Sequence, residues 1–137
     1  MDNIQPISDS EGPTCASSAR RKTVLVVDDE LYFRELVAAI LSKAGYNVDG
    51  VVDGSEAIAF ASKNHIDLLI TDIVMPNREG IETIQYFSKL VPKVPIVAVS
   101  GSSRYLRSAK ALGAVAVLEK TATVPDLLHT VQSLIGE

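Results

Sequence analysis

The sequence predicts an α/β domain in which helices cover both faces of a doubly wound, five-stranded parallel sheet. Short apolar runs alternate with segments of helical periodicity five times between Thr23 and the end of the 137-residue chain. Such repeated strand–helix alternation is typical of a parallel sheet. Three of the runs are continuously apolar, as expected for strands that are buried on both faces.

The five apolar runs have the length of strands. The runs TVLVV, IDLLI and VPIVAV suit interior positions, whereas Asp49 and Gly50 interrupt NVDGVV, which therefore suits an edge. In chain order the predicted strands are 23–27, 47–52, 66–70, 94–99 and 114–118.

Five further segments place apolar residues at the 3.6-residue spacing of an amphipathic helix. The first begins after Glu30 and stops at Gly45, and Pro92 ends the third. Thr123 can cap the last helix. The predicted helices lie between Glu30 and Gly45, from Ser55 onward, through Ile81, Ile84, Phe87 and Val91, near 103–112, and from Thr123 onward.

Composition favours a soluble, cytoplasmic protein. The chain is 47% apolar and 22% charged, and no apolar stretch approaches the roughly 18 residues of a membrane span. The N-terminus lacks the basic and apolar regions of a secretion signal. A net charge of −4 argues against nucleic-acid binding, and the single cysteine, Cys15, excludes an intramolecular disulfide. We therefore expect neither a nucleic acid nor a membrane as a partner.

Residues 1–21 have almost no apolar periodicity and predict a flexible N-terminal tail, so the folded domain is expected to comprise residues 22–137. No sequence remains after Glu137 for an output domain. We therefore expect a single-domain protein that acts through contacts with other proteins.

Polar residues gather where the predicted strands end. In an open parallel sheet the carboxyl ends of the strands share one edge, which is where ligands bind. These positions hold acids, hydroxyls, a glycine and an amine. They are Asp28, Asp29, Glu30, Thr71, Asp72, Ser100, Gly101, Glu119 and Lys120.

Helix capping alone could explain any one of these acids, but it explains the set poorly. Two carboxylates about 4 Å apart repel by roughly 4 kcal/mol at an effective dielectric of 20. Crowded carboxylates therefore protonate, move apart or bind a cation, and oxygen ligands suit Mg²⁺ or a similar ion such as Mn²⁺. With Lys120 and Ser100 nearby, the set predicts a phosphoryl site in which Asp72 is the nucleophile.

Four motifs, VLVVDDE, LLITDIVMP, IVAVSG and GAVAVLEK, resemble those of the receiver domain of two-component response regulators. They occur in the same order and at similar spacing, and the resemblance covers about residues 22–137. It implies a flavodoxin-like fold with strand order 2-1-3-4-5. It also implies a phosphorelay, in which Asp72 accepts phosphate from a phosphohistidine on a sensor histidine kinase.

The resemblance also assigns roles to individual residues. Asp29, Asp72 and the backbone carbonyl of Val74 would bind Mg²⁺, and Asp28 would often act through a water. Lys120 would pair with the phosphoryl group, or with Asp72 before phosphorylation. Ser100 would bond the phosphoryl oxygens and switch a surface on the fourth helix, fifth strand and fifth helix, where a downstream protein would bind.

Two positions depart from the family pattern. Val117 replaces the usual Tyr or Phe, and it cannot swing between buried and exposed rotamers. Thr121 replaces a Pro that usually follows a cis peptide bond, and a cis bond before Thr would cost about 3 kcal/mol. Val74 and Ser102 offer no base to orient an attacking water, so we expect slow hydrolysis of the phosphorylated form.

Alternative functions remain open from the sequence. The chain could pass phosphate to a histidine phosphotransfer protein, dimerise on phosphorylation, or act as a receiver-like scaffold without phosphate. An aspartyl-phosphate phosphatase of the haloacid dehalogenase type has a second Asp two residues after the nucleophile, where this chain has Val74. A nucleotide-binding function lacks the glycine-rich phosphate loop.

Overall fold

The computed structural model describes residues 21–73, 79–90, 93–101, 109–111, 113–120 and 124–136. In this part of the chain, five parallel strands form one sheet in the order β3-β2-β4-β5-β6, which confirms the predicted order 2-1-3-4-5. The elements are β2 (Thr23–Val27), α1 (Leu31–Lys43), β3 (Asn47–Val51), α2 (Gly54–Lys63), β4 (Leu68–Asp72), α3 (Glu79–Ser88), β5 (Ile96–Ser100), β6 (Ala116–Glu119) and α5 (Val124–Ile135).

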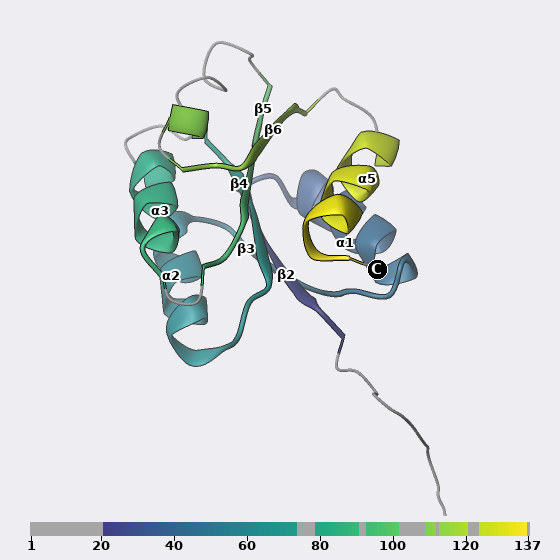
Figure 1. Cartoon of the computed structure of the whole chain (residues 1–137), viewed down its shortest axis with the longest axis horizontal. Coiled ribbons are helices and arrows are strands. Elements are labelled where there is room, and N and C mark those ends of the chain that lie inside the picture. The colour runs from purple at the N-terminus through teal and green to yellow at the C-terminus, as the bar shows by residue number, and fades with distance from the viewer. Residues whose placement is uncertain are drawn as a thin grey trace, which may run out of the picture.

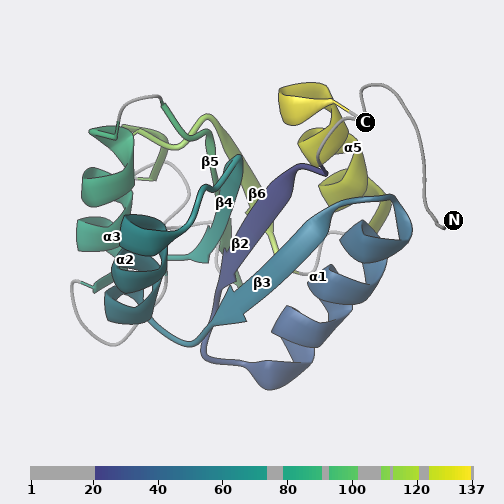
Figure 2. The same ribbon diagram turned by 90° about the horizontal axis from the view of Figure 1, so that it is seen from below.

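Helices cover both faces of the sheet. Helices α1 and α5 lie on one face, and α2 and α3 lie on the other (Figures 1 and 2). Side chains alternate along β2, so Val24 and Val26 join the core under α1 and α5. Leu25 and Val27 join the core under α2 and α3. The continuous apolar run is therefore explained by burial on both sides.

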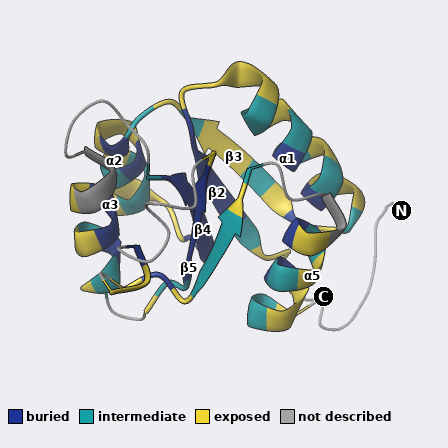
Figure 3. Ribbon diagram, turned by 90° about the horizontal axis from the view of Figure 1, so that it is seen from above, coloured by how far each residue is buried: buried dark blue, intermediate teal, exposed yellow. Residues whose placement is uncertain are grey.

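Burial separates interior strands from the edge strand as predicted. All residues of β4 and β5 are buried, and only Thr23 of β2 is partly exposed (Figure 3). Strand β3 is an edge strand in which Asn47, Asp49 and Gly50 are exposed. The polar residues that interrupt this segment therefore lie at positions of the edge strand that are exposed to water.

Strands β4, β5 and β6 begin two residues later than their apolar runs. Strand β4 starts at Leu68 and continues through Thr71 to Asp72, because these polar residues pair with Ala98 and Val99 of β5. Strand β5 likewise ends at Ser100. The predicted ends at 70, 99 and 118 were therefore too early, since apolar character marks burial and the pairing extends into the polar residues.

Most helix boundaries follow the predicted signals. Helix α1 is followed by Gly45, which has a φ of 104°. Helix α2 starts at Gly54, one residue before the predicted Ser55, because Asp53 caps it by accepting the Glu56 N–H at 2.9 Å.

Several predicted features lie outside the described residues. They are the tail 1–21 apart from Arg21, the residues Val91 and Pro92, the cap Thr123, and helix 103–112 except for 109–111, which are helical. The third helix itself ends at Ser88, so its predicted continuation through Val91 was wrong: the N–H groups of Lys89 and Leu90 donate to carbonyls three residues back and close the helix in a turn. Among the described helices, none combines the length and the apolar character that crossing a bilayer requires.

Candidate functional site

Four strands deliver polar side chains to one edge of the sheet. Asp72 and Ser100 are the last residues of β4 and β5, while Asp28 and Lys120 directly follow β2 and β6. Backbone hydrogen bonds hold Asp28 and Lys120 in place. The Asp28 N–H donates to the Val51 carbonyl at 3.1 Å, and the Lys120 N–H donates to the Ser100 carbonyl at 2.8 Å. The predicted gathering of residues at this edge is therefore observed.

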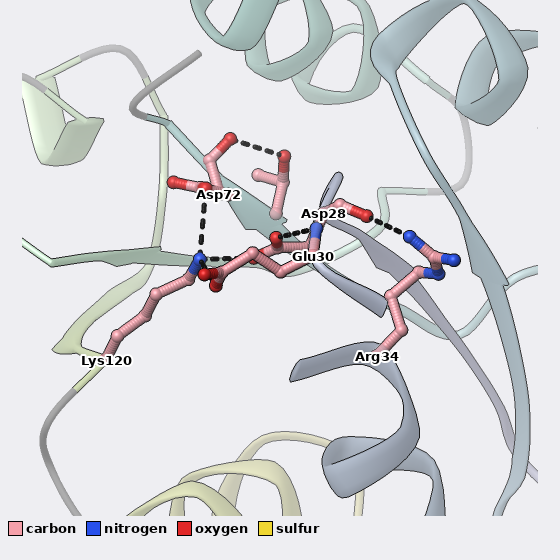
Figure 4. A network of polar contacts seen from close by, with 6 residues as sticks. Asp28, Glu30, Arg34, Asp72 and Lys120 are labelled. Atoms are coloured by element: carbon pink, nitrogen blue, oxygen red, sulfur yellow. Dashed lines mark hydrogen bonds and ion pairs between the residues drawn. The ribbon is translucent and has the colours of Figure 1, made fainter. Parts of the chain in front are cut away.

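The ammonium of Lys120 lies among three carboxylates (Figure 4). Its Nζ is 2.7 Å from Glu30 Oε1, 2.8 Å from Asp28 Oδ2 and 3.2 Å from Asp72 Oδ2. The ammonium donates hydrogen bonds to Glu30 and Asp72, and it faces the buried Asp28 Oδ2 as an ion pair. Any further anion that binds Lys120 must therefore compete with these three carboxylates.

The start of α1 lines the other side of the lysine. Lys120 Nζ is 5.0 Å from the centroid of the Phe33 ring, within the range of a cation–π contact. Arg34 Nη1 donates to the Asp28 carbonyl at 2.7 Å, and the Glu30 N–H donates to Asp28 Oδ1 at 2.8 Å (Figure 4). Spacings of three and four residues put Glu30, Phe33 and Arg34 on one side of the first helical turn.

Gly50 makes room for this arrangement. A Cβ at Gly50 would lie 3.2 Å from the Cδ of Arg34, so the arginine passes over β3 where the strand has no side chain. Nothing in the sequence pattern connects Gly50 with the site. The arginine belongs to α1 and the glycine to β3, and the packing of this helix against the edge strand brings them together.

Three carboxylates form a group that can hold a cation. One oxygen each from Asp28, Asp29 and Asp72 lies within 4.8 Å of the others. Asp28 is 0% exposed and Asp72 is 5% exposed, whereas Asp29 is exposed. Carboxylate oxygens with room for water at one side are the ligands that Mg²⁺ prefers. The residues present therefore fit the predicted ion.

Burial and pairing shift the ionisation of the site. Burial, followed by the nearby charge of Asp72, raises the pKa of Asp28 above 3.8, although bonds from Lys120 and the Glu30 N–H oppose this. Burial alone would lower the pKa of Lys120, but the hydrogen bonds to Asp28 and Glu30 and the charge of Asp72 outweigh it and raise that pKa well above 10.5. The hydrogen bond from Lys120 lowers the pKa of Glu30. The lysine is therefore firmly cationic.

The remaining predicted residues have different outcomes. Ser100 is buried at the end of β5, next to the strand that carries Asp72. Val117 is partly buried and packs against the core under α2 and α3. Val74, Ser102 and Thr121 lie outside the described residues. The pairing of Glu30 with Lys120 and the contacts of Phe33 and Arg34 were not predicted, because a helical pattern explains these residues without a site.

A doubly wound sheet whose carboxyl edge joins an acidic trio, Asp28, Asp29 and Asp72, to a lysine has the architecture of a signalling receiver. Residues 24–132 match the model of the response regulator receiver domain. The chain belongs to this family.

Curated relatives are mostly longer than this chain. PdtaR of Mycobacterium tuberculosis, a transcriptional regulatory protein, is 32% identical over 128 residues, which is 91% of this chain and 62% of PdtaR. LuxN of Vibrio campbellii, an autoinducer 1 sensor kinase/phosphatase, is 36% identical over 66% of this chain but only 11% of LuxN. RcsC of Escherichia coli, a sensor histidine kinase, is 36% identical over 58% of this chain and 8% of RcsC.

Solved structures agree with the fold. The chemotaxis response regulator CheY4 of Vibrio cholerae has a TM-score of 0.76 at 32% identity, covering 84% of this chain and 99% of CheY4. The response regulator TrrA of Thermotoga maritima, solved in complex with Mg²⁺–BeF, has a TM-score of 0.75 at 31% identity. That match covers 82% of this chain and 98% of TrrA.

Proposed function

We propose that this chain is a phosphorelay module in which Asp72 accepts a phosphoryl group, with Mg²⁺ required, from a phosphohistidine. The donor would be a sensor histidine kinase or a histidine phosphotransfer protein. The observation that carries this proposal is the placement of Lys120 within 3.2 Å of Asp72, beside an acidic trio that includes Asp72.

Asp72 is better suited to be the nucleophile than Asp28. One oxygen of Asp28 accepts the Glu30 N–H, the other faces Lys120, and the residue is fully buried. Asp72 ends the central strand β4, and its side chain is 6% exposed. In the proposed step an Asp72 oxygen forms a bond to phosphorus as the P–N bond to the donor's histidine breaks, and the imidazole leaves.

The chain's own residues supply charge and position for this step. Lys120 would neutralise phosphoryl oxygens, and Ser100, at the end of β5, would donate a hydrogen bond to one of them. Asp28, Asp29 and Asp72, with the backbone carbonyl of Val74, would hold Mg²⁺, which when bound supplies positive charge to the transferring group. The similarity to TrrA, whose structure was solved in complex with Mg²⁺–BeF, supports this choice of ion.

A protein donor is supported by apolar side chains around the site. Leu31 and Tyr32 at the start of α1 are 58% and 77% exposed, and Val52 after β3 is 38% exposed. Both segments flank Asp28, whose N–H is bonded to Val51. Exposed apolar side chains in this position suit a protein surface better than a small charged donor. Relatives named as sensor kinases are consistent with such a partner.

The output is proposed to be a protein contact at the end of the domain formed by β6 and α5, the described part of the surface that the resemblance implies. Val117 of β6 packs against the core under α2 and α3, on the other face of the sheet from α5. Its side chain is also too short and too stiff to rotate as an aromatic side chain would. The change at this face would therefore have to be carried by other residues, such as Ser100 and the backbone that follows it.

The test uses acetyl phosphate with and without Mg²⁺. Intact mass is measured for the wild type, for Asp72→Asn and for Asp49→Asn, whose carboxylate is exposed on the edge strand. We expect a single phosphoryl group on the wild type and on Asp49→Asn, only with Mg²⁺, and none on Asp72→Asn. No gain in the wild type, repeated with a phosphorylated histidine phosphotransfer protein, would instead favour a scaffold that signals without phosphate.

A further inference from the structure

We infer that Glu30 is a positioning residue for Lys120, holding its ammonium in the metal-free, unphosphorylated site and releasing it to the incoming phosphoryl group. This inference rests on the proposed function of Asp72. Glu30 directly follows Asp28 and Asp29 and precedes α1. Its carboxylate lies 2.7 Å from Lys120 Nζ, which is the shortest of the three ion-pair distances at this ammonium.

Glu30 is the most exposed of the three partners. Its side chain is 62% exposed, compared with 0% for Asp28 and 6% for Asp72. Releasing a carboxylate into water avoids the desolvation cost that would follow if a buried group lost its partner. A phosphoryl oxygen that needs one of the three N–H donors of Lys120 can therefore displace Glu30 more easily than Asp28.

Glu30 is expected to act on two steps in opposite directions. Its negative charge offsets that of Lys120, so the acidic trio attracts a cation more strongly when Glu30 is present. The same carboxylate competes for the ammonium that the phosphoryl group needs, and it repels an anionic donor. Removal of its charge should therefore weaken Mg²⁺ binding and accelerate phosphoryl transfer once Mg²⁺ is saturating.

The effects should be modest because the pair is partly exposed. Exposed ion pairs correspond to about two- to fivefold in an equilibrium constant. For Glu30→Gln we expect Mg²⁺ affinity to fall by about two- to fivefold and the phosphorylation rate to rise by about the same factor. A residue with only a structural role would change both in the same direction, or change neither.

The experiment compares wild type, Glu30→Gln and Glu35→Gln as full-length proteins. Glu35 is exposed on α1, the helix that Glu30 precedes, and is not one of the carboxylates at Lys120, so Glu35→Gln makes the same change in net charge away from the lysine. Mg²⁺ affinity is measured by calorimetric titration without phosphodonor. The rate is measured by intact mass with acetyl phosphate at saturating Mg²⁺, and thermal unfolding verifies that each variant is folded.

Opposite shifts in Glu30→Gln, with Glu35→Gln close to wild type, would support the inference. Shifts in the same direction, no shift, or equal shifts in both variants would overturn it while leaving the proposed function intact, provided that the wild type gains phosphate. A wild type that gains no phosphate from any donor would overturn the proposed function, and the inference with it.

Discussion

The acidic trio should make the metal-free protein less stable than it would be without one of its charges. Asp29 is the member best suited to a test, because it is exposed and is not among the carboxylates that pair with Lys120. Replacing it by Asn removes a charge at nearly the same side-chain volume. We therefore expect Asp29→Asn to raise the free energy of unfolding without metal and to remove most of the stabilisation by Mg²⁺.

The size of the effect follows from the separation of the charges. The carboxylate oxygens of Asp29 and of Asp28 or Asp72 can come within 4.8 Å, which corresponds to a repulsion of about 0.9 kcal/mol per pair at the dielectric of water. Attraction between Asp29 and the nearby Lys120 offsets part of the two repulsions. A gain of about 1 kcal/mol remains, equivalent to a rise of roughly 4 °C in Tm for a domain of this size.

The assay is urea unfolding of wild type and Asp29→Asn, once with EDTA and once with Mg²⁺. Bound Mg²⁺ should stabilise the wild type by RT ln(1 + [Mg²⁺]/Kd), whereas the variant, with a much larger Kd, should gain little. Asp49→Asn serves as the control, since its carboxylate is exposed on β3 and is outside the trio. An Asp29→Asn protein that is no more stable in EDTA, or that gains as much from Mg²⁺ as the wild type, would refute the reasoning.

Three further predictions concern single residues. Lys120→Met should slow phosphorylation, measured by intact mass, by about 100-fold because it removes a ligand of the phosphoryl group. It should also tighten Mg²⁺ binding, measured by calorimetry, because it removes a competing cation, and weaker Mg²⁺ binding would contradict this. Gly45→Ala should lower the free energy of unfolding, measured in urea, by about 1–2 kcal/mol because Gly45 has a φ of 104°. An added Cβ would meet nothing within 4 Å, so only backbone strain contributes, and unchanged stability would contradict the prediction. Burial raises the pKa of Asp28 in the folded state, so its stabilising contribution is present at low pH and is lost as pH rises above 3.8. In EDTA, the free energy of unfolding of the wild type minus that of Asp28→Asn should therefore decrease as the pH rises above 3.8. A difference that increases with pH would show that burial does not raise the pKa of Asp28.

The pattern of apolar residues was sufficient to predict the strands and the sheet edge that carries the site, whereas the strand order was implied by the resemblance to receiver domains. Hydrophobic alternation identifies strands because burial and apolar character coincide in β2, β4 and β5. Strand ends are less visible, since Asp72 and Ser100 are polar yet buried and paired. The order of apolar and polar residues along the sequence indicates which residues are buried. It does not indicate where hydrogen bonding between strands stops.

The roles of Glu30, Phe33 and Arg34 could not be found in the same way. Phe33 has the spacing of an ordinary core residue of α1, and a charged residue near the start of a helix needs no ligand to explain it. Their shared function depends on Lys120, which is 90 residues from Glu30 in the chain. Such a contact becomes visible only in the fold, where the ends of β2 and β6 lie at the same edge of the sheet.

The charges of the site link metal binding to the proposed phosphoryl transfer. In the described part of the chain, the ammonium of Lys120 pairs with three carboxylates, those of Asp28, Glu30 and Asp72, and a fourth, that of Asp29, lies beside two of them. A phosphoryl group on Asp72 would add further negative charge at the place where repulsion is already greatest. A divalent cation reduces that repulsion before transfer and reduces it more afterwards, so each event should strengthen the other. On this reasoning Mg²⁺ should bind more tightly to the phosphorylated protein, and the same excess of negative charge that weakens the resting fold makes the cation a requirement of the step.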